Sequence, residues 1–157
     1  MSIQTSTVIG ANIATTGTTQ LFALGTRMSY TDGQSYLYVK ATAATITQYY
    51  FVGVDEDFNA ALLTTAMAQD GWMIGTTQVT VAASEYFWLC VGGANVSGAI
   101  EGSTKVDSTL YTSGVAGVLS ETSTSGSKLD GVVNVVSATT EVSTVEVILI
   151  SPRCTCF

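Results

Sequence analysis

The chain has 157 residues, a formal net charge of -7, 11% charged residues and no histidine. Its length suits one domain with a buried core. The five basic residues are scattered, which argues against binding a phosphate backbone, and the absence of histidine excludes imidazole catalysis and histidine metal sites. Ordinary soluble domains carry about 25% charged residues. The low charge therefore predicts a symmetric oligomer or a docked coat component, with a neutral, threonine-rich monomer as the alternative.

The sequence favours neither a membrane nor a secretory role. No apolar run approaches the ~18 residues that a spanning helix needs, and the first ten residues lack the features of a signal peptide. We therefore expect the protein to stay where it is made.

Cys90 lies in an apolar run, as a buried thiol does. Cys154 and Cys156 form a C-x-C tail. We favour two free thiols there over a metal site whose other ligands come from further copies of the chain, and over a disulfide to another copy.

The first strands are expected after an N-terminal arm at residues 1–20. This segment is rich in Thr, Ser and Gly, with a short strand near residues 5–9, and we expect the rest to be either an arm that orders on another surface or a mobile terminus. Asp32-Gly33 then separates two β-prone runs within residues 25–41, which is a strong signal of a β-hairpin. Along the second run the side chains alternate between two faces of a strand.

The stretch at residues 73–93 organises the predicted fold. Two apolar runs flank a polar break, and because residues 86–91 are apolar on both faces, we expect a central strand covered on both sides. Before it, a β run at residues 49–54 leads into the acidic segment Asp55–Asn59. This segment matches only the start of a calcium loop, so a solvated turn is favoured over a cation site. One helical turn is expected at residues 64–69, capped by Thr64.

The later sequence predicts more short strands, at residues 95–101, 110–112, 116–119, 132–136 and 145–150, the first of them an edge strand. Short strands at close spacing indicate an all-β protein, a small antiparallel barrel or sandwich. We expect a β-rich domain at residues 21–150, between the arm and a short C-terminal tail at residues 151–157. No internal repeat is evident.

No group of residues in the sequence indicates catalysis. The carboxylates lie in turns and at strand ends, and nothing places two of them across a cleft. We therefore expect no enzymatic activity and no cofactor. One alternative is a platform of aromatic rings on which a sugar stacks, although packing in a core or an interface is the commoner use of such residues. The platform residues are Tyr36, Tyr38, Tyr49, Tyr50 and Trp72.

Short motifs follow one another between residues 21 and 150. They are Leu24-Gly25-Thr26-Arg27, the Asp32-Gly33 turn with Tyr36-Leu37-Tyr38-Val39-Lys40-Ala41, Phe51-Val52-Gly53-Val54-Asp55-Glu56-Asp57, Asp70-Gly71-Trp72-Met73-Ile74-Gly75, Tyr86-Phe87-Trp88-Leu89-Cys90-Val91-Gly92-Gly93, Leu110-Tyr111-Thr112 and Ala116-Gly117-Val118-Leu119. In their order, these motifs resemble the capsid decoration or cement proteins, small β-rich virion proteins encoded in the head modules of tailed bacteriophages. The arm and the C-x-C tail lie outside the resemblance.

The resemblance implies a structural function. Such proteins bind the outside of the assembled major capsid protein shell, often as homotrimers, and tie neighbouring capsomers together against the pressure of the DNA inside. It implies synthesis in the host bacterial cytoplasm, a place on the outer capsid surface of the virion, and two partners, the major capsid protein and further copies of the chain, without nucleic acid or membrane. The residues expected at the capsid or oligomer interface are Ile3, Val8, Ile9, Ile13, Tyr36, Tyr38 and Tyr50.

Two other functions stay open at this point. The first keeps the structural class and places the chain in the phage tail or at the base of a head fibre. The second is a carbohydrate-binding module that uses the tyrosine platform. For the structural function, the extended N-terminal arm has a ready use, because such a segment can add a strand to the sheet of a neighbouring subunit.

Overall fold

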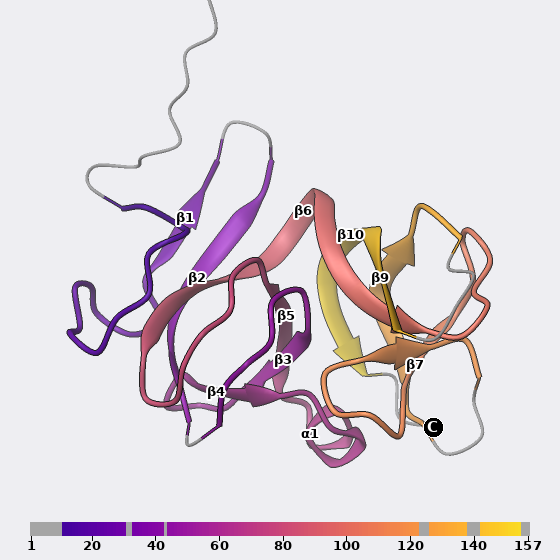
Figure 1. The fold of residues 1–157 in the computed structure, drawn as a ribbon, viewed down its shortest axis with the longest axis horizontal. Coiled ribbons are helices and arrows are strands. Elements are labelled where there is room, and N and C mark those ends of the chain that lie inside the picture. Colours follow the sequence, from indigo (N-terminus) through magenta and orange to yellow (C-terminus); the bar gives the residue numbers. More distant parts are fainter. Residues whose placement is uncertain (1–10, 31–32, 43, 123–125, 138–141, 155–157) are drawn as a thin grey trace, which may run out of the picture.

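The structure is a computed structural model that describes residues 11–30, 33–42, 44–122, 126–137 and 142–154, and every structural statement below refers to these residues. The predicted all-β class is confirmed (Figure 1). The strands are β1 (Arg27–Ser29), β2 (Ser35–Ala41), β3 (Phe51–Val54), β4 (Asn59–Leu62), β5 (Met73–Thr77), β6 (Tyr86–Glu101), β7 (Leu110–Thr112), β8 (Leu119–Ser120), β9 (Lys128–Asn134) and β10 (Val142–Cys154), with one helix, α1 (Thr65–Gln69).

The strands form one sheet whose pairings close into two circuits. In the first ring, β2, β4, β3, β5 and β6 pair in this order, and β6 pairs back to β2. In the second ring, β6, β8, β7, β9 and β10 pair in this order, and β10 pairs back to β6. The long strand β6 belongs to both rings, and Figure 1 shows it crossing from the first to the second. Strand β1 is attached to the first ring through β2 alone.

The two rings have the same topology. When the five strands of each ring are taken in chain order, the first pairs in parallel with the third and antiparallel with the fifth. The second strand pairs antiparallel with the third and the fourth, and the fourth pairs antiparallel with the fifth. The parallel partners are separated by the same number of residues, from Lys40 to Asn59 and from Ile100 to Leu119. The chain therefore repeats one strand arrangement, with β6 ending the first copy and beginning the second.

These parallel pairs modify the predicted antiparallel arrangement. In each ring the third strand returns beside the first after the chain has passed through the second, and this crossover brings the two strands together in the same direction. Hairpin signals in the sequence report only pairings between neighbouring strands. The sheet is consequently mixed, although most of its pairs are antiparallel.

Strand β6 is covered on both faces along its first half, as predicted. Residues Phe87 to Val91 are all buried. Trp88 and Cys90 join one apolar cluster, while Phe87, Leu89 and Val91 join another. The second cluster draws on strands around the first ring and fills its inside, as side chains do in a small barrel. The first cluster covers the opposite face and continues into the second ring through residues such as Ile100 and Leu119.

The predicted edge strand at residues 95–101 is not separate, because β6 runs without a break from Tyr86 to Glu101. The chain passes through Gly92 and Gly93 without ending the strand. Gly93 has φ +117, and a Cβ there would come within 2.6 Å of the Cα of Gln34. Only glycine accommodates this bend against the β1–β2 hairpin. In the sequence the two glycines suggest the end of a strand. In the structure they bend one continuous strand from the first ring into the second.

Several local predictions are confirmed. Strands β1 and β2 form the expected hairpin. The side-chain oxygen of Thr64 accepts a hydrogen bond from the Met67 N–H, so it caps α1 as expected. Strand β9 ends at Asn134, which leaves Val135 and Val136 outside the strand predicted for them, and β10 extends past residue 150 into the predicted tail. The strand predicted near residues 5–9 lies outside the described residues.

Candidate functional site

The segment predicted to be a free arm packs, over its described part, against the first ring. Ala11 is buried, and Ile13 packs on the apolar cluster that contains Trp88. Gly17 pairs with Tyr86 at the start of β6 through two backbone hydrogen bonds of 2.8 and 3.3 Å. Residues 12–22 thus arch over the outer face of β2 and β6, and we call this segment the arch. Residues 1–10 of the predicted arm lie outside the described residues, so Ile3, Val8 and Ile9 are not placed.

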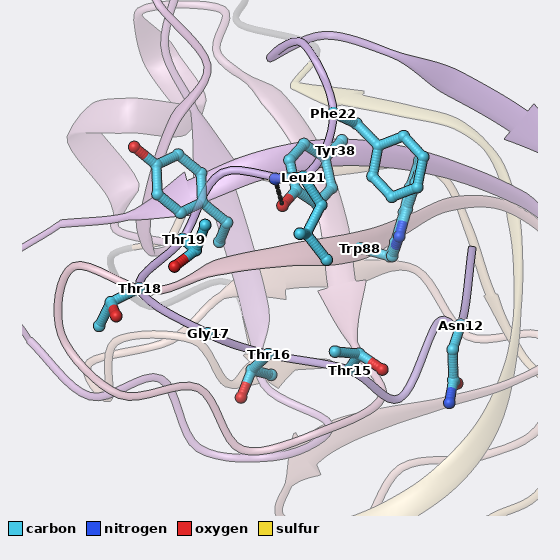
Figure 2. Close-up of a pocket in the computed structure, with 11 residues that line it drawn as sticks. Asn12, Thr15, Thr16, Gly17, Thr18, Thr19, Leu21, Phe22, Tyr38 and Trp88 are labelled. Atoms are coloured by element: carbon cyan, nitrogen blue, oxygen red, sulfur yellow. Dashed lines mark hydrogen bonds between the residues drawn. The ribbon is translucent and has the colours of Figure 1, made fainter. Parts of the chain in front are cut away.

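Beneath the arch lies a cluster of four aromatic rings. Tyr38 and Trp88 face each other across the β2–β6 pair, with ring centroids 4.9 Å apart. Phe22 of the arch packs against both, at 5.3 Å from Tyr38 and 5.2 Å from Trp88. Tyr86 stacks on Tyr38 at 6.1 Å. The Leu21 N–H donates a 3.1 Å hydrogen bond to the Tyr38 hydroxyl (Figure 2), so the arch is held by polar as well as apolar contacts.

The arch and the aromatic cluster enclose a pocket of about 340 Å³. Figure 2 shows the Leu21 side chain between the two limbs of the arch, with Trp88 and Phe22 on one side. No lining residue is an acid, a lysine or an arginine. The pocket is lined by Asn12, Thr15, Thr16, Gly17, Thr18, Thr19, Leu21, Phe22, Tyr38, Tyr86 and Trp88. The sequence offered one signal of it, since Tyr38 and Trp88 share a face of paired strands, but the covering threonines carry no periodic pattern.

A second pocket, of about 430 Å³, combines carboxylates with aromatic rings. Asp55, Glu56 and Asp70 line it together with Trp72. The Asp55 carboxylate is engaged within its own turn, where it accepts hydrogen bonds from the backbone N–H groups of residues 57 and 59, at 3.0 and 2.8 Å, and from the Asn59 side chain at 3.1 Å. These bonds fit the solvated turn predicted for this segment.

The residues of the predicted tyrosine platform do not lie together at the surface. Tyr36 and Tyr38 are 2% and 3% exposed. The arch and the aromatic cluster cover Tyr38, and Tyr30, which directly follows β1, packs on Tyr36. Tyr49, Tyr50 and Trp72 are half-buried. Both faces of β2 are therefore covered, and a sugar platform that includes Tyr36 and Tyr38 has no support in this structure.

The predicted interface residues within the described part of the chain are Ile13, Tyr36, Tyr38 and Tyr50. Tyr36 and Tyr38 are buried, and Ile13 is half-buried against the chain's own apolar cluster. Tyr50 is half-buried next to Gly117. The large apolar side chains that are exposed in the described residues are others: Leu21, Val106, Val115, Val135, Val136 and Ile150. The interface assignment stays a prediction.

No cluster of three or more potential metal ligands lies within the described ranges. Cys90 is buried, as expected, and its thiol donates a 3.6 Å hydrogen bond to the Gly92 carbonyl oxygen, while Cys156 and the side chain of Cys154 lie outside what is described. No helix in the described part of the chain is long and apolar enough to span a membrane. Lys128 and Asp130 form an ion pair at 3.2 Å on the surface.

Comparison with known proteins leaves the family of the chain open, since no protein-family model matches the sequence. No curated protein matches it either.

Proposed function

We propose that the chain is a structural virion protein that binds the outer surface of a phage capsid and stabilises the contacts between major capsid protein subunits. The observation that carries the proposal is the order of the short motifs between residues 21 and 150, which resembles the capsid decoration proteins. Four of these motifs fall on strands of the first ring, namely β2, β3, β5 and β6. The resemblance therefore rests on the framework of the fold.

The surface supports a docking function. Six large apolar side chains are exposed over the described residues, with Ile150 at 65% and Leu21 at 64%. The chain is also poor in charged residues, so docking onto a protein shell takes few charged side chains out of water. Strand β1 adds an edge, because among the described strands it pairs only with β2, and an edge strand can pair with a further strand.

The test is binding to empty capsids of the phage that encodes the chain. Purified protein is mixed with capsids, the particles are separated from free protein, and cryo-electron microscopy locates the added density. We expect density outside the shell at repeated positions and saturation at a fixed number of copies per capsid. Capsids without added protein serve as the control. Density confined to the tail or to a fibre base would favour the structural alternative, and no bound protein at saturating concentration contradicts the proposal.

The mass of the purified protein in solution tests the expected self-association. Trimers before capsid contact support a preformed decoration unit. Monomers in solution that assemble only on the shell also agree with the proposal. They would mean that trimers form on the capsid, where the local concentration is high.

A further inference from the structure

We propose that the pocket beneath the arch binds one uncharged sugar unit of an oligosaccharide. This function is independent of capsid binding. The pocket shares only Tyr38 with the tyrosine platform considered from the sequence, because the ligand would enter between the arch and β6. The inference rests on the construction of the pocket, the chemistry of its lining, and an unpaired donor at its base.

The pocket is built from ordered parts. The arch is fixed near its middle by the two backbone hydrogen bonds between Gly17 and Tyr86, and near its end by the bond from the Leu21 N–H to the Tyr38 hydroxyl. Phe22 then anchors it on Trp88. A ligand therefore meets a preformed cavity, and little ordering has to accompany binding.

The chemistry of the lining matches a neutral, hydroxyl-rich ligand. Thr15, Thr16, Thr18 and Thr19 line the pocket, and within the described residues none of their hydroxyls has a hydrogen-bond partner. Each hydroxyl both donates and accepts, as sugar hydroxyls do. The lining residues offer no charge to pair with a charged ligand, and the Lys40 ammonium lies outside the lining, 5.5 Å from the centroid of the Tyr86 ring. A wholly apolar ligand would take the threonine hydroxyls from water without replacing their bonds.

The strongest single observation concerns Trp88. Its side chain is 3% exposed, and its indole N–H has no hydrogen-bond partner among the residues that the structure describes. No buried side-chain nitrogen or oxygen in the described structure lacks a partner, so the indole nitrogen is among the few atoms of Trp88 that remain accessible. Trp88 is one of the lining residues, and in the proposed complex this accessible donor bonds to the occupant of the pocket. Tyr38 and Trp88 are almost fully buried, so the aromatic surface of the pocket comes from the half-buried rings of Phe22 and Tyr86. Such rings beside a tryptophan N–H suit a sugar ring, which has apolar C–H faces and hydroxyl edges.

The size of the cavity limits the ligand. Ligand pockets usually measure about 300–1,000 Å³. At about 340 Å³, this pocket lies at the lower end and suits a single sugar unit, with the rest of a longer chain in solvent.

The indole N–H resonances provide a direct readout. The chain has two tryptophans, and Trp72 lines the second pocket, so it serves as an internal control. In ¹H–¹⁵N spectra of the ¹⁵N-labelled full chain, titration with neutral disaccharides should shift the Trp88 indole peak saturably and leave the Trp72 peak in place. The Trp72→Phe variant assigns the two peaks. A longer neutral oligosaccharide and one carrying carboxylates, titrated separately, show whether a longer neutral glycan is preferred and whether negative charge is rejected.

Matched variants test the threonines. The double variant Thr16→Val, Thr19→Val keeps the side-chain shape and should weaken binding about tenfold, which corresponds to the loss of one or two hydrogen bonds. Thr109→Val, at an exposed position away from the pocket, should bind as the unchanged protein does. Three results overturn the proposal: no movement of the Trp88 peak at saturating sugar, equal movement of both tryptophan peaks, or unweakened binding by the double variant with its fold intact.

Discussion

Because β6 belongs to both rings, a defect made in the second ring should be felt in the first. Ile100 lies in the second half of β6, is 0% exposed, and pairs with Ser143 of β10 and Leu119 of β8. Replacing a buried isoleucine with alanine costs roughly 2–5 kcal/mol. We take about 3 kcal/mol for Ile100→Ala, which is a large part of the ~5–15 kcal/mol that stabilises a typical protein.

Urea denaturation followed by tryptophan fluorescence measures this effect at a distance. Both tryptophans belong to the first ring or the turn before β5, so their emission reports on the ring that was not altered. With a slope of about 2 kcal/mol per molar urea, a loss of 3 kcal/mol lowers the midpoint by about 1.5 M. Far-UV circular dichroism, which reports on both rings, should show the same midpoint.

Val136→Ala is the matched control, because this side chain is 49% exposed and lies after the end of β9. We expect it to change stability by no more than about 0.5 kcal/mol. The reasoning is refuted if Ile100→Ala leaves the fluorescence midpoint unchanged while the circular dichroism signal falls in two steps. That result would mean that the rings unfold separately in spite of the strand they share.

Three further changes test other contacts. Gly75→Ala should lower the melting temperature by about 4–8 °C, because its Cβ would lie 2.5 Å from the Cys90 carbonyl oxygen, whereas Gly114→Ala, with nothing within 4 Å, should change it little. Deleting residues 2–15 should lower the melting temperature further than deleting residues 2–10, since only the longer deletion removes buried Ala11; equal values would show that the start of the arch adds no stability. Asp55→Ala should cost about 1–2 kcal/mol in urea unfolding and Asp57→Ala almost nothing, because the Asp55 carboxylate holds the turn; similar losses would contradict this.

The sequence was sufficient for the elements whose signals are local. The β1–β2 hairpin follows from its turn residues, α1 from the Thr64 cap, and the double burial of residues 86–91 from their unbroken apolar run. Each of these signals acts over a few neighbouring residues, and the tertiary structure does not oppose any of them.

The features that escaped prediction depend on contacts between distant segments. Thr- and Gly-rich residues 11–20 have no periodic apolar pattern, yet Gly17 docks on Tyr86 through backbone groups, which a side-chain pattern does not report. Tyr36 and Tyr38 alternate with apolar residues as if half of β2 were solvated, but the arch and its neighbours cover that face. The repeated topology has no counterpart in the sequence, because equivalent strands of the two rings share a pattern of pairing and not their amino acids. The candidate pocket combines the first two effects, so its outline was out of reach of sequence reasoning.

The bend at Gly93 carries a mechanical consequence. Two barrels in one chain are usually joined by a flexible linker that lets each move independently. Here one continuous strand, β6, forms part of both barrels. Torque on either half is transmitted along that strand, and its backbone hydrogen bonds resist such movement. Cutting the chain at the bend would leave one half of β6 in each ring, because residues 86–92 pair with β2 and β5 and residues 93–101 pair with β8 and β10, and it would remove the covalent coupling between the two rings.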